Sequence, residues 1–167
     1  MAESTLVLGL DPGTAITGYG LVREVDGDLQ AVDYGVITTP ARTPLPARLQ
    51  QLYHALTALI DRRTPDSAAV ESLFFSANVK TAMAVGHARG VALLALAEAG
   101  LSIAEYKPNE VKQAVAGYGS ADKFQMQQMV AALLGLDEPP QPDDAADALA
   151  VAICHLNTSH FQRLIDE

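Results

Sequence analysis

Among the acidic residues on predicted strands and helices of this 167-residue chain, where a carboxylate is less expected than in a loop, four are candidates for chemistry. Asp11 ends one short apolar run, and Glu71 lies inside another. Asp144 and Asp147 stand three residues apart near the start of a predicted last helix, so they share one helical face. Burying such carboxylates is costly unless a shared ligand compensates their charge. Because hard cations take oxygen ligands, the four acids predict a site for Mg²⁺ or Mn²⁺.

Most of these acids also have a purely structural interpretation. Asp11 precedes a Pro-Gly pair and could be a turn residue. Glu71 could face solvent from its strand. Asp143 and Asp144 could be the N-cap and first-turn acids that favour a helix N-terminus. Asp147 lies further into the helix, where capping explains it less well.

The net charge of the chain is −9, from 11 Lys and Arg against 20 Asp and Glu, which by itself disfavours a nucleic-acid-binding protein. The acids gather toward the two ends of the sequence. Residues 1–40 carry one base and six acids, residues 41–123 nine bases and seven acids, and residues 124–167 one base and seven acids. If the two ends meet, they form the negative pocket that a divalent cation needs, while the middle could present a basic surface. A solvated acidic surface is the alternative.

The elements that must position these acids follow from apolar periodicity. A hairpin signal at 26–28 and alternating segments around it predict three antiparallel strands at the start of the chain. Helices and strands then alternate, which predicts an α/β fold with a mixed five-stranded sheet and helices on both faces. No repeat or linker divides the chain, so we expect a single domain over residues 1–167. The predicted strands are 5–11, 17–25, 29–37, 67–75 and 101–106, and the predicted helices are 46–62, 78–99, 108–116, 122–134 and 143–156.

Composition predicts a soluble protein of the cytoplasm. Apolar residues make up 49% of the chain, enough for a proper core at this length. No window approaches about 18 uninterrupted apolar residues, so we expect no membrane span. The N-terminus lacks the basic region and the long apolar run of a secretory signal. The single cysteine, Cys154, excludes a disulfide framework and a cysteine-based zinc site.

Two lysines and two aromatic residues could contact a nucleic acid. Lys112 and Lys123 flank the glycine-rich segment AVAGYGSA, which would allow a phosphate to approach the backbone closely. Phe74 and Phe75 follow Glu71, and an aromatic ring there could stack on an unpaired base. The alternatives are two solvated lysines and two rings that fill the core.

The predicted helix 78–99 is apolar on every side and has small residues at many positions. Helices of this kind are usually buried. One face could pack on the sheet while another meets a second subunit, since small residues permit close approach in a two-fold contact. Burial within a single subunit is the alternative.

Several motifs, in their order along the chain, resemble the RuvC family of Holliday-junction resolvases. They are LGLDPGT, ITGYG, AVESLFF, GHARGVAL, VKQAVAGYGSADKFQMQQMV and DDAADALAVAI, and they run from about Leu6 to about His155. The resemblance implies an RNase H-like fold, a homodimer, and symmetric, metal-dependent cleavage of four-way junction DNA in recombination and repair. It places the four catalytic, metal-binding acids at Asp11, Glu71, Asp144 and Asp147. Asp143 departs from the pattern, which has a small apolar residue there.

The reaction suits these residues, because two cations about 3.5–4 Å apart can serve both the attacking and the leaving oxygen of a phosphodiester. We expect two Mg²⁺ ions per active site, with Mn²⁺ as an alternative. Asp11 would bridge both ions, Glu71 and Asp144 would each complete one shell, and Asp147 would hold the cation that orients water. The resemblance also implies DNA contacts at Lys112, Lys123 and a junction-probing Phe74, and work alongside the branch-migration proteins RuvA and RuvB.

Three other functions compete with this hypothesis. The turn LGLDPGT also resembles the first phosphate loop of sugar-kinase and Hsp70-like ATPases, but the chain offers no second, similar half. A short RNase H-like family that trims ribosomal RNA precursors shares the first-strand motif, but VESLFF, HARG and GYGSADK fit it poorly. A non-catalytic junction-binding module remains the alternative outside enzymes, although all four acids are present.

Overall fold

The computed structural model describes residues 3–72 and 78–167. Its strands are β1 (Ser4–Asp11), β2 (Ile16–Val25), β3 (Asp28–Thr38), β4 (Ser67–Glu71) and β5 (Ser102–Tyr106). Its helices are α1 (Leu45–Arg63), α2 (Val79–Glu98), α3 (Pro108–Ala116), α4 (Lys123–Leu133) and α5 (Asp143–Asp166).

The five strands form one mixed sheet, as predicted, and their order is β3-β2-β1-β4-β5. β1, β2 and β3 pair antiparallel, whereas β4 pairs parallel with both β1 and β5. The hairpin between β2 and β3 turns at Asp26 and Gly27, whose φ angles of 51° and 88° are the positive values that a tight two-residue turn requires. β1 and β4 are therefore parallel neighbours in the middle of the strand order, and their carboxyl ends lie side by side.

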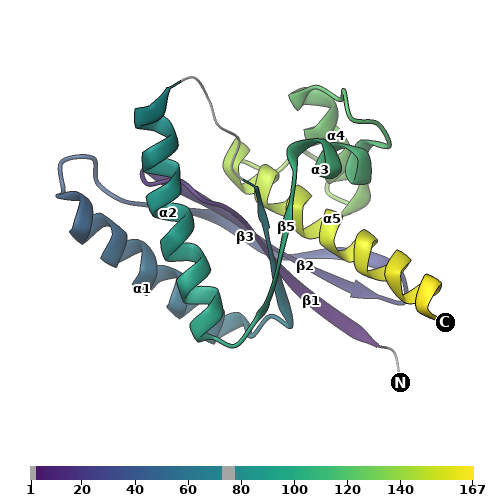
Figure 1. Cartoon of the computed structure of the whole chain (residues 1–167). Coiled ribbons are helices and arrows are strands. Elements are labelled where there is room, and N and C mark those ends of the chain that lie inside the picture. The colour runs from purple at the N-terminus through teal and green to yellow at the C-terminus, as the bar shows by residue number, and fades with distance from the viewer. Residues whose placement is uncertain (1–2, 73–77) are drawn as a thin grey trace.

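Helices cover both faces of this sheet, which confirms the predicted α/β architecture (Figure 1). α1 and α2 pack on one face against Leu6, Leu8 and Leu10 of β1. α3, α4 and α5 lie on the other face, toward which Val7 points. Because side chains alternate along a strand, odd-numbered residues of β1 face α5 and even-numbered ones face α1 and α2.

Glycines on the α5 face let this helix approach the sheet very closely. A Cβ atom on Gly9 of β1 would lie 2.1 Å from the main-chain oxygen of Ala148. A Cβ atom on Gly18 of β2 would lie 2.0 Å from the main-chain oxygen of Asp144. Real Cβ atoms essentially never make such contacts, so α5 packs into a groove in the sheet that only glycine leaves open at these two positions. The first turns of α5 are fixed in this way beside the end of β1.

Two element boundaries differ from the prediction by more than one residue. The strand expected at 67–75 ends at Glu71, and residues 73–77 lie outside the described residues. The last helix, expected to end at 156, continues to Asp166. The segment after 156 contains no glycine or proline that would stop it, and residues such as Gln162 and Arg163 favour helix.

α2 differs from the buried helix that its composition suggested. Ala88, Ala92 and Leu96 are buried against the sheet, but Met83 and Leu94 are exposed. Among the described helices, α2 alone is long and apolar enough to cross a membrane by length and composition, a property that the search for uninterrupted apolar runs missed. A core helix of a soluble protein passes the same test, and α2 packs on the sheet through its alanine face. Only 22% of its most apolar window is buried in the single chain, so an apolar face remains uncovered.

Candidate active site

The sheet register places two of the predicted acids next to each other. Leu10 pairs with Val70 in the parallel ladder, so Asp11 and Glu71 follow side by side at the carboxyl ends of β1 and β4. Asp11 has the same parity as Val7, and Glu71 the same as Ala69, so both side chains point to the face that α5 covers. Apolar burial along the two strands thus aims both carboxylates at the start of α5.

α5 supplies the other two acids. Asp11 pairs with Gly18, whose missing side chain makes room for the main chain of Asp144. Asp144 and Asp147 are three residues apart in the first two turns of α5 and share one face. One ligand oxygen each from Asp11, Asp144 and Asp147 lies within 4.8 Å of the others, and we call these three residues the aspartate cluster.

Electrostatics mark the cluster as a site with too much negative charge. Burial, followed by the charges of Asp147, Asp144 and Glu71, raises the pKa of Asp11 to about 8. Burial also raises the pKa of Glu71 and of Asp147, and in both cases a neighbouring aspartate adds to the effect. Carboxylates that resist ionisation together are stabilised as anions by a cation among them. The donor set, all carboxylate oxygens, fits a hard divalent ion.

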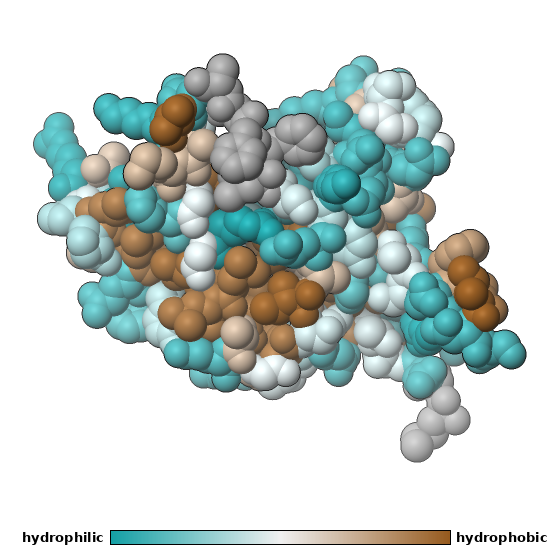
Figure 2. Space-filling model, viewed as in Figure 1, coloured by the Kyte–Doolittle hydropathy of each residue, from teal (hydrophilic) through white to brown (hydrophobic). Residues whose placement is uncertain are grey.

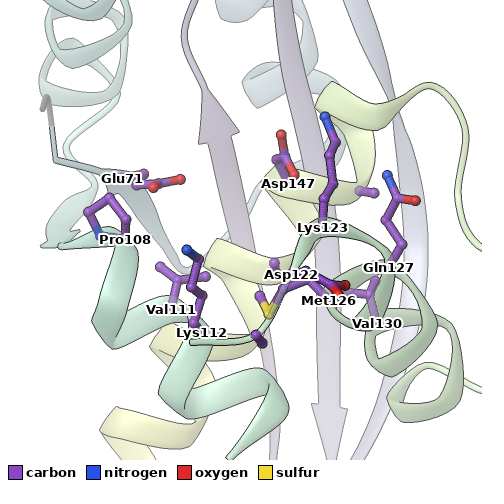
Figure 3. A pocket seen from close by; sticks show the side chains of 13 residues that line it. Glu71, Pro108, Val111, Lys112, Asp122, Lys123, Met126, Gln127, Val130 and Asp147 are labelled. Carbon is purple, nitrogen blue, oxygen red and sulfur yellow. The ribbon is translucent and has the colours of Figure 1, made fainter. Parts of the chain in front are cut away.

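Glu71 stands across a cavity from the lysines and close to the cluster. It does not belong to the group of described acids within 4.8 Å, but the charge of Asp147 raises its pKa. The cavity, about 280 Å³ in volume, is lined by Glu71 and Asp147 together with Lys112 of α3 and Lys123 of α4 (Figure 3). Figure 3 shows the Glu71 carboxylate directed into this space. The cavity therefore has an acidic wall, formed by Glu71 and Asp147, and a wall formed by Lys112 and Lys123, which we call the lysine wall.

Asp143 turns away from the cluster despite its neighbours in sequence. Its carboxylate accepts from Nζ of Lys123 at 2.9 Å and from the amide of Gln127 at 2.9 Å. The bond from Lys123 lowers the pKa of Asp143, opposite to the shift of Asp147. Of the two adjacent aspartates, the structure brings Asp144 to the cluster and gives Asp143 to the lysine wall.

The two lysines stand on either side of the glycine-rich segment, as their spacing suggested. Gly117 ends α3 with a φ of 85°, a left-handed conformation that favours glycine. Asp122 and Gln125 then form a capping box at the start of α4, which fixes the first turn that carries Lys123. Phe74 and Phe75, the predicted base-stacking residues, lie outside the described residues.

Sequence reasoning missed Arg89, which contacts the site's backbone. Its guanidinium donates to the main-chain oxygen of Glu71 and to the carboxylate of Glu105. The available signal was a single charge in a long apolar stretch between Lys80 and Glu98. Such a charge, inside a helix that packs on a sheet, needs partners there.

His155 has the structural role that the scattered histidines suggested. Its Nδ1 lies 2.7 Å from the hydroxyl of Tyr106, and its Nε2 lies 3.2 Å from the hydroxyl of Ser67. Burial lowers the pKa of His155, so the ring is neutral and one nitrogen accepts while the other donates. This network ties α5 to β4 and β5 beneath the cavity.

The surface shows where apolar side chains remain exposed. Figure 2 shows hydrophobic residues gathered over α2 and again at the end of α5. The exposed residues on these helices are Val79, Met83, Leu94, Phe161, Leu164 and Ile165. The apolar face of α2 lies on the side of the sheet opposite to the aspartate cluster.

Comparisons with known proteins agree on one family. The family model described as crossover junction endodeoxyribonuclease RuvC matches residues 7–155 of the chain. A protein with this description from Chloroflexus aggregans is 63% identical over 152 residues, covering 91% of this chain and 93% of the relative. One from Desulfitobacterium hafniense is 60% identical over 153 residues, covering 92% and 93%. The solved structure of Thermus thermophilus RuvC in complex with a Holliday junction substrate superposes with a TM-score of 0.90 at 36% identity, over 95% of this chain and 96% of that one.

Proposed function

The chain belongs to the RuvC family of crossover junction endodeoxyribonucleases, and from this premise we propose that it resolves four-way DNA junctions by metal-dependent phosphodiester hydrolysis at the aspartate cluster. The mixed sheet and the likeness to solved RuvC structures agree with the RNase H-like fold. The observation that carries the proposal is the convergence of Asp11 of β1 with Asp144 and Asp147 of α5, together with a raised pKa at Asp11.

Each of the four acids is assigned a different part of the metal site. Asp11 lies beside Glu71 in the sheet and belongs to the aspartate cluster, so its carboxylate would help to hold both ions. Asp144 and Asp147 complete one side of the cluster, and Glu71 stands on the other. We assign two Mg²⁺ ions to the site, with Mn²⁺ as the alternative. When bound, these ions would activate the attacking water and stabilise charge on the leaving oxygen.

The lysine wall is assigned to the DNA backbone. Lys112 and Lys123 line the same cavity as Glu71 and Asp147, so a phosphate in that cavity would meet both the acids and the lysines. Each lysine contributes a positive charge to an otherwise acidic chain, at the place where the phosphodiester must lie. Phe74 follows Glu71 by three residues and is assigned to stacking on a base at the junction.

A homodimer would suit a substrate with two equivalent strands to cut. The exposed apolar face of α2 is the surface assigned to this contact, because isolated exposed patches of this kind mark interfaces. Family membership further suggests work with the branch-migration proteins RuvA and RuvB in the cytoplasm, where the DNA is. A sedimentation mass equal to one chain at micromolar concentration would contradict the dimer.

Cleavage of a synthetic four-way junction tests the proposal against a linear duplex of the same sequence. We expect symmetric nicks in the junction with Mg²⁺ or Mn²⁺, none with chelator, and little cutting of the duplex. Asp11→Asn, Asp144→Asn and Asp147→Asn should each abolish cutting while junction binding in chelator persists. Asp143→Asn is the matched control, since its carboxylate binds Lys123 and not the cluster. An Asp144→Asn enzyme that cuts like the wild type would remove the cluster from the reaction.

A further inference from the structure

Arg89 of α2 reaches the backbone of the proposed site from the opposite face of the sheet. Its side chain is only 11% exposed, and its guanidinium has two partners that are distant in sequence and are brought to it by the fold. Nη1 donates to the main-chain oxygen of Glu71, and Nη2 donates to the carboxylate of Glu105. One side chain thus connects α2 to the carboxyl ends of β4 and β5.

The position of Glu71 explains why this contact matters. Glu71 is the last residue of β4, and Val70 before it pairs with Glu105 of β5. Beyond Glu71, the N–H of Ser72 still donates to the carbonyl of Tyr106 at 2.7 Å, but the strand has ended. The carboxylate of Glu71 projects toward α5, while its carbonyl accepts from Arg89 on the α2 side. Arg89 therefore holds the main chain of Glu71 from the α2 side, while the Glu71 side chain points to the α5 side.

We propose that Arg89 is a positioning residue, which fixes the end of β4 so that the Glu71 carboxylate stays at the distance from the aspartate cluster that metal binding requires. This inference rests on the proposed metal-dependent function. Groups that orient a metal ligand without touching the metal commonly affect affinity or activity about 10- to 100-fold. Arg89 differs from such a group in acting through the ligand's main chain.

Glu105 gives the arginine its direction. A buried guanidinium is stable only when its donors are satisfied, and a carboxylate is its strongest partner. Glu105 is half-exposed and lies beside the end of β4, so it draws the guanidinium toward the carbonyl of Glu71. Its neutralisation should weaken the arrangement without removing the bond to Glu71.

A purely structural role would also be compatible with the contacts, because Arg89 connects α2 to the sheet. The two roles differ in what they do to metal binding. A structural link changes thermal stability alone, whereas a positioning residue changes the metal concentration that the site needs. Mn²⁺ binding to the DNA-free protein, followed by electron paramagnetic resonance, measures this without any cleavage.

The experiment compares Arg89→Gln, Arg89→Lys and Glu105→Gln with the wild type. Arg63→Gln is the matched control, because Arg63 of α1 also forms an ion pair, with Asp33 of β3 at 2.7 Å, and neither element contributes a residue to the aspartate cluster. For each protein we would measure the Mn²⁺ dissociation constant, the Mg²⁺ concentration for half-maximal cleavage, junction binding in chelator, and the melting temperature.

Arg89→Gln should weaken Mn²⁺ binding and raise the half-maximal Mg²⁺ concentration by about 10-fold or more, with junction binding in chelator unchanged. Arg89→Lys, which keeps one donor for the Glu71 carbonyl, should recover part of the loss, and Glu105→Gln should show the smallest effect of the three. Arg63→Gln should lower the melting temperature at most. If Arg89→Gln lowers the melting temperature and leaves both metal constants at wild-type values, the positioning role is wrong.

Asp11→Asn separates failure of this inference from failure of the proposed function. Wild-type protein that binds Mn²⁺ and loses it in Asp11→Asn supports the metal site, whatever Arg89 does. If the wild type binds no Mn²⁺, or if Asp11→Asn binds it equally well, the metal site itself is wrong and Arg89 has nothing to position. Should Arg89→Gln fail to fold, Arg89→Lys and Glu105→Gln decide the question by the same constants.

Discussion

The two faces of the sheet are packed on different principles. On the α5 face, Gly9 and Gly18 leave no side chain between strand and helix, and main-chain atoms of the two elements nearly touch. On the α1 and α2 face, Leu8, Leu10 and Leu21 fill the space with apolar side chains. The aspartate cluster lies on the first face, and the leucine-rich core lies on the second.

The α5 face fixes the positions of the acids, whereas the α1 and α2 face stabilises the fold. Main-chain contact fixes a distance, because neither element can yield without moving as a whole. Leucine packing contributes burial energy, but flexible side chains can adjust to small changes. The acids are therefore held where geometry is least adjustable, and the opposite face supplies much of the hydrophobic stabilisation together with the support from Arg89.

Gly18→Ala should break this division most strongly. The added Cβ would lie 2.0 Å from the main-chain oxygen of Asp144, so the start of α5 must move by about 1 Å to relieve the clash. Displacements of this size at a reacting centre can cost about 100-fold in rate. We expect a loss of that order in single-turnover cleavage of a four-way junction, with weaker Mn²⁺ binding.

Gly35→Ala is the matched control for this substitution. It adds the same methyl group to a strand glycine, but the nearest atom is the hydroxyl end of the Tyr19 side chain at 2.9 Å, which can rotate away. Its cleavage rate should stay close to that of the wild type. If Gly18→Ala also cleaves at the wild-type rate while folded, close main-chain packing does not position the acids.

Leu56→Ala tests the other face. Leu56 of α1 is fully buried in the apolar core against the sheet. Truncating a buried leucine typically costs about 2–5 kcal/mol of unfolding free energy, and each kcal/mol lowers the melting temperature by about 2–4 °C in a protein of this size. Well below the new melting temperature, metal affinity should be unchanged. A change in metal affinity as large as that of Gly18→Ala would show that the two faces do not differ in this way.

The pH dependence of stability tests the comparison further, because Asp11, Glu71 and Asp147, the carboxylates whose pKa is raised, lie on the α5 face. Burial and the neighbouring carboxylates raise the pKa of Asp11 from 3.8 to about 8, and Glu71 and Asp147 shift in the same direction. Between these values the folded, metal-free protein keeps a proton that the unfolded chain releases, so its stability falls as pH rises from about 4 to about 8. Melting temperatures in chelator should decline over this range.

Asp11→Asn should flatten that decline and melt several degrees above the wild type near pH 8, since it removes the group whose ionisation is opposed. Added Mn²⁺ should reverse the order, because it stabilises only the protein that can bind it. A decline that is as steep in Asp11→Asn as in the metal-free wild type would contradict the raised pKa of Asp11, because the comparison cancels the opposite effect of the lowered His155 pKa.

The sequence allowed much of the α5 face to be predicted, because its signals are local. The turn after Asp11, the spacing of Asp144 and Asp147, and the hairpin at 26–28 each follow from neighbouring residues. The mixed sheet and the helices on both faces followed from the alternation of element types. The convergence of the acids was inferred from the cost of burying them and from the resemblance, but the strand register and the close approach of α5 that produce it could not be predicted.

What could not be predicted depends on contacts between distant elements. Arg89 meets Glu71 and Glu105 only because α2 crosses the ends of β4 and β5, and no spacing in the sequence encodes that crossing. The partner of Asp143 was likewise not predictable, because Lys123 lies 20 residues away along the chain. The exposed face of α2 was obscured by composition, because apolar residues look alike whether buried in one chain or covered by another.

Substitutions at the lysine wall should have the smallest effect of those proposed. Each lysine that contacts a duplex phosphate should contribute about 0.9 to the slope of log affinity against log salt concentration. Lys112→Gln and Lys123→Gln should therefore each reduce the slope for junction binding in chelator by about one contact, and an unchanged slope would remove that lysine from the interface.

Asp143→Asn should have the opposite effect on junction binding. It frees the Lys123 ammonium from its carboxylate partner and removes a negative charge beside the DNA, so binding should tighten, though by less than about tenfold because the pair is exposed. In a Lys123→Gln background most of this gain should vanish. An equal gain in both backgrounds would mean that Asp143 repels DNA directly and does not act through Lys123.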